Sequence, residues 1–301
     1  MADLRLVCDT LPGRQIETSI YHNAKVFYYP DGMQRFVFCD RPIFKDTGFE
    51  DVFGKTPLHF EDDFFVLPDP DADPRSDNVR RARNAIFDIA MLNEFTHFIT
   101  VTIAPDNDLG IDRKDAKAVS KYVRKWLNNH VRRKGLVYVL VPEYHEDGAI
   151  HMHGLISGRL SFVDSGTVLA PGFDKPVKRL TALQRGISLE DCRTVYNMPD
   201  WSLGYSTAIA LYGERQNVAK YITKYITKDI QKIFGNFYYA GGKYQDGIKL
   251  RRKPPCGLLD VDFNSIDAPV YFCEQAGRSF KYFTFKGEDN HAEHETTNGN
   301  R

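Results

Sequence analysis

The sequence has few cysteines and lacks several features that would assign it to a special class of protein. The five cysteines are spread over 301 residues with no CxxC pair, which argues against a disulfide framework or a zinc knuckle and favours a reducing compartment. No basic-then-apolar segment opens the chain, and no apolar run approaches the roughly 18 residues of a membrane span. We therefore expect a cytoplasmic protein with no signal peptide and no membrane contact.

Neither positive nor negative charge is in excess. Forty basic residues (Lys and Arg) balance forty acidic ones, and the isoelectric point is near 7.1, so the whole chain gives no signal for a polyanionic partner. The balance hides two unlike regions. Residues 40–77 hold eleven acids and four basic residues, whereas residues 214–253 hold ten basic residues and three acids. The basic region can bind phosphate locally in a neutral protein.

Composition divides the chain into three parts. Residues 1–77 are predicted to be a β-rich extension that ends in an acidic, proline-rich linker. Residues 78–253 are predicted to form the main domain, with a weakly patterned insertion at about 158–200. Residues 254–301 are predicted to be a C-terminal extension whose polar tail is disordered.

Hydrophobic spacing predicts helices and strands in the main domain. The expected helices are 78–93, 112–135 and 213–235, and Asp112 and Gly135 are the expected cap and stop of the second one. The expected strands are 95–103, 136–144 and 149–156, which are rich in β-branched and aromatic residues.

The stretch "PEYHEDGAIHMHGLI", residues 142–156, concentrates histidines and acids around a turn. A three-residue loop ending in a left-handed Gly148 would place Glu143 opposite His151, and His153 would share their face of the hairpin. Two imidazoles and a carboxylate form three ligands of a metal site with open positions. The alternative is that the histidines are only half-buried strand residues.

The third predicted helix carries the repeat "KYITKYITKD". Tyr221 and Tyr225 are four residues apart and share one helix face, with Lys224 and Lys228 beside them. A phenol has a pKa of about 10 and becomes a nucleophile at neutral pH only when a cation or metal favours its oxyanion. The alternative is that the tyrosines pack beside the isoleucine stripe and the lysines are solvated.

Three motifs of this sequence, taken in order, resemble those of a known family. "FITVT" (98–102), "HMH" (151–153) and "YITK" (221–224 and again 225–228) resemble the motifs of HUH rolling-circle replication initiators. The chain is similar to replication-associated proteins of phages and plasmids, and its doubled tyrosine resembles microvirus-type initiators. Glu143 matches the acid that precedes the histidine pair in several members. The resemblance spans about residues 80–240.

The resemblance implies a fold and a mechanism. The fold would be α+β, a ferredoxin-like or RRM-like antiparallel sheet with helices on one face and the histidine strand at its centre. Glu143, His151 and His153 would hold Mg²⁺ or Mn²⁺ against the scissile phosphate of single-stranded origin DNA. A tyrosine would attack, leaving a 5′-phosphotyrosine and a free 3′-OH. Tyr225 is the favoured nucleophile, Tyr221 would act in a second transesterification, and Lys228 and Lys224 are the matching lysines.

Contacts to DNA are predicted from charge. The candidate phosphate-binding residues are Lys121, Arg124 and Lys125 on the second helix and Arg251, Arg252 and Lys253 near the end of the main domain. A solvated helix face is the alternative. The aromatic segment 234–244 could stack unpaired bases or pack in the core. No GxxxxGK[ST] motif occurs, so no nucleotide cofactor is expected, and a host helicase and polymerase would be needed in a bacterial cell.

Other functions use the same residues. A relaxase or transposase of the same HUH chemistry is possible, although relaxases usually carry their tyrosine before the histidine motif. A zinc-dependent hydrolase would use Glu143, His151 and His153 with water as the nucleophile. A DNA-binding protein without catalysis would use the histidines only for packing.

Overall fold

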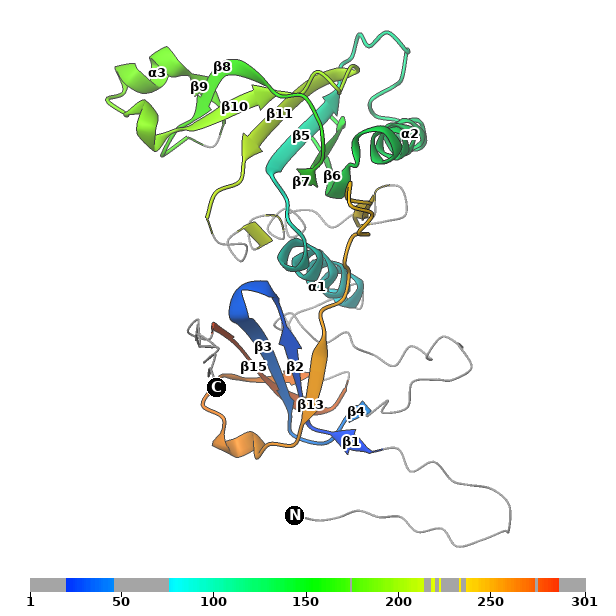
Figure 1. Cartoon of the computed structure of the whole chain (residues 1–301), viewed down its shortest axis with the longest axis vertical. Helices are drawn as coiled ribbons and strands as arrows, with labels where there is room; N and C mark the ends of the chain where they lie inside the picture. Colours follow the sequence, from blue (N-terminus) through cyan, green and yellow to red (C-terminus); the bar gives the residue numbers. More distant parts are fainter. Residues whose placement is uncertain are drawn as a thin grey trace, which may run out of the picture. The chain divides into compact units, whose positions relative to one another are not determined.

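The computed structural model divides the chain into two compact units. It describes residues 20–45, 76–173, 175–213, 218–219, 222, 233, 237–273 and 276–286. Unit 1 is built from Met1–Phe27, Gln34–Leu58 and Cys256–Phe285, and unit 2 from Tyr28–Met33, His59–Pro255 and Lys286–Arg301. Figure 1 gives the course of the chain. Residues 67–75 of the predicted acidic linker and the predicted polar tail lie outside the described residues.

Unit 1 contains a five-stranded sheet made from both ends of the chain. Its strand order is β13-β2-β3-β15-β14. The strands are β2 (Ala24–Tyr28), β3 (Met33–Cys39), β13 (Cys256–Leu259), β14 (Val270–Cys273) and β15 (Arg278–Lys286), and a separate pair is formed by β1 (Tyr21–His22) and β4 (Phe44–Lys45). The β segments predicted for the N-terminal part therefore pair with strands of the C-terminal part.

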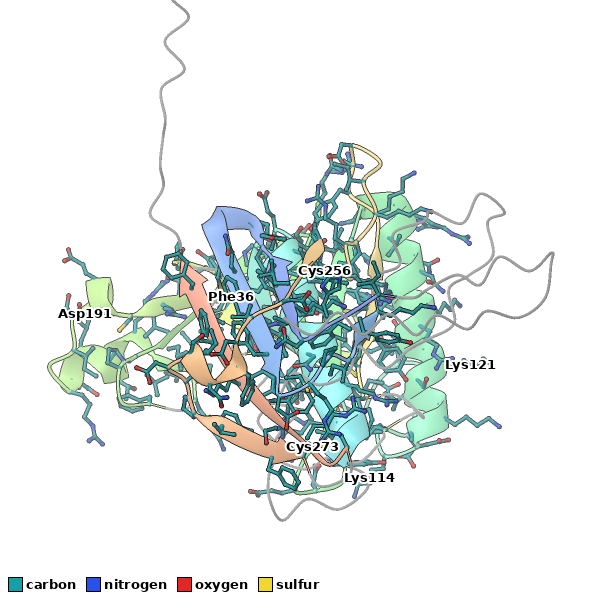
Figure 2. All side chains as sticks on the ribbon, turned by 90° about the horizontal axis from the view of Figure 1, so that it is seen from below. Phe36, Lys114, Lys121, Asp191, Cys256 and Cys273 are labelled. Carbon is teal, nitrogen blue, oxygen red and sulfur yellow. The ribbon has the colours of Figure 1, made fainter. Side chains whose placement is uncertain are left out.

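Aromatic side chains on one face join the central strands of this sheet. The ring of Phe283 stacks on Phe36 at 4.8 Å and on Phe38 at 5.5 Å between centroids. Phe36 and Phe38 are two residues apart in β3, so they share a face and meet the same neighbour. Figure 2 labels Phe36 among the side chains.

Unit 2 contains an eight-stranded sheet in which the paired strands run antiparallel. The order is β12-β6-β7-β5-β11-β10-β8-β9. The strands are β5 (His97–Ile103), β6 (Val137–Tyr144), β7 (Ile150–Ser157), β8 (Val163–Leu169), β9 (Val177–Lys178), β10 (Arg193–Asn197), β11 (Gly204–Ala210) and β12 (Tyr239–Gly242). The predicted α+β class with an antiparallel sheet is confirmed, and β7 lies inside the sheet between β6 and β5.

Two long helices of unit 2 follow the predicted hydrophobic spacing. In α1 (Ser76–Leu92), Val79, Ala82, Ile86, Ile89 and Ala90 are buried. In α2 (Ala116–Lys134), Val119, Val123, Trp126 and Leu127 are buried. Among the described residues, no helix is both long enough and apolar enough to cross a membrane.

The N-terminal cap of α2 differs from the predicted one. The Asp115 side chain accepts hydrogen bonds from the backbone N–H groups of Lys117 and Ala118, whereas Asp112 accepts one from Lys114 N before the helix begins. The prediction of Asp112 as the cap is wrong, because Asp115 lies where its oxygen meets the first free N–H groups of the helix. The helix ends as predicted at Gly135, which has a left-handed φ of 63°.

The predicted insertion at 158–200 is part of the main sheet. It contributes β8, β9 and β10, together with the short helices α3 (Arg179–Gln184) and η2 (Leu189–Asp191). The strands β10 and β8 pair with a register shift between Val195 and Tyr196, so an irregular strand obscures the alternation on which prediction relies. The next strand, β11, was not predicted.

Alternate residues of β5, β6 and β7 point to opposite faces of the sheet. Ile99, Val101, Ile103, Leu140, Ile150, Met152 and Ile156 form one core cluster with the buried residues of α2. Their neighbours in sequence point the other way. We call this second side, which carries Thr100, Thr102, His151, His153 and Glu143, the histidine face.

Candidate metal centre and nucleic-acid interface

The hairpin of β6 and β7 has the predicted turn and register. Gly148 has a left-handed φ of 83°, and His145 N donates to Ala149 O at 2.8 Å. Glu143 is paired directly with His151. A residue with a Cβ is strained at that φ, so the glycine allows the tight loop that brings the carboxylate strand beside the histidine strand.

The histidine face is organised in rows that cross four strands. The first row is Tyr205, Thr102, His151 and Glu143, and the second is Thr207, Thr100, His153 and Val141, each from β11, β5, β7 and β6 in turn. A third row, Ile209, Phe98, Leu155 and Val139, is apolar. The polar groups therefore form a strip bounded on one side by an apolar row.

The three predicted metal ligands lie next to one another. His153 Nε2 is 3.1 Å from Glu143 Oε2, with 15% and 25% of the side chains exposed. The ring centroids of His151 and His153 are 6.0 Å apart. The carboxylate thus contacts the diagonal histidine rather than the directly paired one, because a glutamate side chain is long enough to reach a diagonal neighbour.

Two threonines hold the other nitrogen of each imidazole. Thr100 Oγ1 is 2.9 Å from His153 Nδ1, and Thr102 Oγ1 is 3.2 Å from His151 Nδ1. In His151, an Nδ1–H that donates to the Thr102 hydroxyl leaves Nε2 unprotonated. In His153, Nε2 contacts the Glu143 carboxylate and so carries the proton, and Nδ1 accepts from the Thr100 hydroxyl. From the sequence alone, "FITVT" was a motif without assigned contacts for its two threonines. The β5–β7 register, which pairs Thr100 with His153 and Thr102 with His151, gives the two hydroxyls a definite partner.

His151 is held in its neutral form. Burial, followed by the charges of His153 and His145, lowers its pKa from 6.5 to about 4, although Glu143 and Asp147 oppose the shift. At neutral pH the ring therefore carries a lone pair that can bind a cation without losing a proton first.

His145 is a further histidine of this face and lies closer to the site than its place at the turn suggested. Its ring stacks on His151 with centroids 4.7 Å apart and an interplanar angle of 6°. Its Nδ1 is 3.2 Å from Asp147 Oδ1, and Asp147 Oδ2 accepts from Arg113 Nη2 at 2.6 Å. A hydrogen bond from Ala149 N and the Arg113 charge hold the pKa of Asp147 below its usual range. The loop therefore fixes one ring against a predicted ligand.

The donor set suits a divalent cation, although the donors are not arranged around a common point. Two imidazole nitrogens and one carboxylate are ligands that manganese, iron and zinc accept, and carboxylate oxygen also suits magnesium. In the part of the chain that the structure describes, no group of three or more His, Cys, Asp or Glu side chains is close enough to hold a metal ion. An ion at this site would exchange the His153–Glu143 contact for bonds to itself.

The predicted nucleophile helix is only partly described. Tyr221, Lys224, Tyr225 and Lys228 lie outside the described residues. Within the same segment, Val218, Ala219 and Ile222 are helical, and Ala219 and Ile222 are fully buried. The predicted roles of the tyrosines and lysines stay predictions.

The predicted DNA-binding residues of α2 lie on the other side of the sheet from the histidine face. Lys121, Arg124 and Lys125 are exposed, while the buried side of α2 packs against the core cluster that contains Met152. Figure 2 shows Lys121 on the outer side of α2. The helix holds seven Lys and Arg residues and no acid.

The two groups of predicted DNA-binding residues approach each other at β12. The Arg124 guanidinium lies 5.5 Å from the Tyr239 ring centroid, and Arg252 Nη2 donates to Ala240 O at 2.5 Å. Arg251, Arg252 and Lys253 are exposed. Tyr239 packs in part against the core cluster, so this ring of the aromatic segment 234–244 serves packing.

Comparison with known proteins places the histidine face in a matched region. Residues 96–230, somewhat less than half of the chain, match a family model whose description begins "replication-associated protein ORF2". No curated protein and no solved structure matches the chain. The family match supports a replication initiator of the Rep type and, with it, a role in DNA replication and an interaction with DNA. The matched range includes Glu143, both histidines and the doubled tyrosine motif.

Proposed function

We propose that this protein is a rolling-circle replication initiator that nicks and rejoins single-stranded origin DNA. The observation that carries the proposal is the first two rows of the histidine face. They place a carboxylate and two imidazoles side by side, and a threonine hydroxyl holds the Nδ1 of each ring.

The reaction is a transesterification at one phosphodiester. The phenol oxygen of Tyr225 attacks the phosphorus, the bond from phosphorus to the 3′-oxygen breaks, and the 3′-oxygen leaves and takes up a proton. The products are a 5′-phosphotyrosine and a free 3′-OH that primes synthesis. Attack by that hydroxyl on the phosphotyrosine reverses the step, and Tyr221 performs the second transfer that ends a round.

The residues of the histidine face orient the phosphate for this attack. Mg²⁺ or Mn²⁺ held by Glu143, His151 and His153 would polarise the scissile phosphate. With a cation in place of the His153–Glu143 contact, Thr100 and Thr102 would accept from the Nδ1–H of each ring and so leave both Nε2 atoms free to bind it. Lys224 and Lys228 are four residues apart in the sequence and would supply positive charge to the phenolate and to the phosphate.

Covalent trapping on labelled single-stranded origin DNA tests the proposal. With Mn²⁺, the wild type is expected to form a protein–DNA adduct that survives denaturation, and EDTA is expected to prevent it. The adduct is expected to disappear in the double variant Tyr221→Phe/Tyr225→Phe, and mass spectrometry of the wild-type adduct is expected to identify Tyr225.

Each alternative gives a different result in the same assay. Metal-dependent cleavage without an adduct would make the site a zinc-dependent or other metallohydrolase, with water as the nucleophile. DNA retained without cleavage would leave a DNA-binding protein. An adduct that forms equally well in His153→Ala with EDTA present would remove the metal from the mechanism.

The basic residues of α2 and of 251–253 bind the phosphates of DNA beside the nick in this proposal. Lys121, Arg124, Lys125, Arg251, Arg252 and Lys253 are exposed, and their charges are sequence-independent contacts. Because the sheet separates α2 from the histidine face, the three α2 residues would hold DNA without touching the reacting phosphorus. A host helicase and polymerase would complete replication.

A further inference from the structure

Tyr205 stands out on the histidine face because nothing in the described structure accounts for it. Its side chain is 68% exposed, and none of the described residues forms a hydrogen bond or a ring contact with it. Two other tyrosines of the same sheet, Tyr196 and Tyr239, lie against the core cluster. Single exposed aromatic residues are common on protein surfaces, so the position of Tyr205 on the sheet, and not its exposure alone, indicates a role in binding.

The register places Tyr205 in the same row as the predicted metal ligands. It is paired with Thr102 of β5, Thr102 is paired with His151 of β7, and His151 is paired with Glu143 of β6. Directly paired residues of antiparallel strands point to the same face. Two strand spacings separate Tyr205 from His151, which is about 10 Å along the row.

The start of β11 is fixed at this register by close backbone contacts. A Cβ added at Gly204 would overlap the backbone of Thr102 and Ala104, so only glycine lets β11 approach β5 here. Ala104 N donates to Leu203 O at 2.8 Å, and the buried Trp201 donates from Nε1 to Thr102 O at 3.1 Å. Tyr205 is therefore presented by a rigid strand rather than by a loop.

We infer that Tyr205 is a base-stacking residue that binds a nucleobase of the single-stranded substrate next to the scissile phosphate. The inference rests on the proposed function, which puts the phosphate at Glu143 and the two histidines. Every base has an aromatic face, so an exposed tyrosine ring binds unpaired bases without reading their sequence. The stack would set how far the strand extends across the sheet and so which phosphate reaches the ligands.

Base stacking requires the aromatic ring of Tyr205 and not its hydroxyl, so two variants that separate the ring from the hydroxyl test the inference. Tyr205→Ala removes the ring, whereas Tyr205→Phe keeps it. Tyr212 is the matched control, because it is equally exposed, at 69%, and lies after the end of β11. Since both side chains are in water, their replacement is expected to leave the midpoint of urea unfolding unchanged.

The experiment measures the affinity of the full chain for a labelled oligodeoxythymidine by fluorescence anisotropy, with EDTA present to prevent cleavage. Tyr205→Ala is expected to weaken binding about tenfold, while Tyr205→Phe and Tyr212→Ala stay within about twofold of the wild type. The slope of log Kd against log salt is expected to be the same for all four proteins, because stacking releases no counterions.

Three results would overturn the inference. Tyr205→Ala could bind as tightly as the wild type, or Tyr205→Phe could lose as much affinity as Tyr205→Ala. In the Mn²⁺ assay, loss of the covalent adduct in Tyr205→Phe would make Tyr205 a nucleophile instead. Failure of the proposed function looks different, since the wild type would then form no adduct with Mn²⁺ while Tyr205→Ala still weakened binding in EDTA.

Discussion

The two faces of strands β5, β6 and β7 are built from alternate residues of the same segments, yet they serve different ends. On one face, Ile99, Val101 and Met152 are at most 2% exposed and pack against α2. On the other face, Thr100 and His153 pair in a polar row. In the stretches 100–102 and 151–153, residues that supply stability therefore alternate with residues that supply polar atoms.

Substitutions at neighbouring positions of these strands should therefore have unrelated effects. The core face tolerates no loss of volume, because its side chains fill space against a helix. The polar residues of the histidine face tolerate loss of volume but no loss of a polar atom, whereas Phe98, Leu155 and Val139 of its apolar row are buried as the core face is. Variants of the histidine face, each compared with a control elsewhere in the chain, separate the two faces.

The largest contrast is expected between two neighbours in β7. His153→Ala should abolish adduct formation with Mn²⁺ and lower the free energy of unfolding by only about 1 kcal/mol, the value of a lost hydrogen bond. Met152→Ala should lower the free energy of unfolding by about 2–5 kcal/mol through a core cavity. Urea unfolding and covalent trapping measure both. A Met152→Ala protein as stable as the wild type would contradict the division of the faces.

A smaller effect is expected from the hydroxyl behind His153. Thr100→Val keeps the shape but removes the partner of Nδ1, so the affinity for Mn²⁺ should fall about 10- to 100-fold, as for other groups that orient metal ligands. Thr207→Val is the control, since Thr207 is the next residue of the same row without a histidine beside it. Titration calorimetry measures the Mn²⁺ affinity, and equal affinities of the two variants would show that the Thr100 hydroxyl does not position the ring.

A charge change on the far side of the sheet should alter binding but not chemistry. Lys121→Ala/Lys125→Ala removes two exposed cations, so the slope of log Kd against log salt for single-stranded DNA should become shallower by about 1.4. The single-turnover rate at saturating DNA should not change. If that rate fell in proportion to binding, α2 would contribute to the chemistry as well.

The last contrast concerns pH. The pKa of His151 is lowered to about 4 by burial first and then by the charges of His153 and His145, while the unfolded chain has the ordinary value of about 6.5. Between these values the unfolded chain binds a proton that the folded chain does not. The free energy of unfolding, measured with EDTA present, should therefore fall as pH drops from about 6.5 to about 4.

A variant of His151 provides the control for this pH dependence. His151→Gln cannot titrate, so its free energy of unfolding should depend less on pH in the same range. Part of the slope should remain, since burial also lowers the pKa of His97. Identical slopes in the variant and the wild type would mean that His151 has the same pKa in the folded and the unfolded chain.

The parts of the candidate site that follow from local rules could be predicted from the sequence. A short loop with Gly148 fixes the register of its own hairpin, so the pairing of Glu143 with His151 could be derived from the residues between them. The buried stripes of α1 and α2 follow from helical spacing for the same reason.

The parts that depend on distant pairing could not be predicted. The partners of Thr100 and Thr102 and the place of Tyr205 depend on how β5 meets β7 and β11, and no local pattern encodes that register. Strand β8 has few buried residues and a register shift against β10. Its sequence therefore lacks the alternation of apolar and polar residues that predicts a strand, and the segment was assigned to an insertion. Asp112 and Asp115 both precede α2, and only the geometry of the first turn decides between them.

The strand order of unit 1 determines which of the two sheets can be completed first during translation. Strand β3 ends at Cys39, but β15 begins only at Arg278, after the whole eight-stranded sheet has been translated. Before β13 is translated at Cys256–Leu259, β2 and β3 form at most a hairpin, which is marginally stable alone. The sheet that carries the histidine face is thus the first to be completed, and a chain that terminates before Cys256 keeps all of its strands while losing three of the five in unit 1.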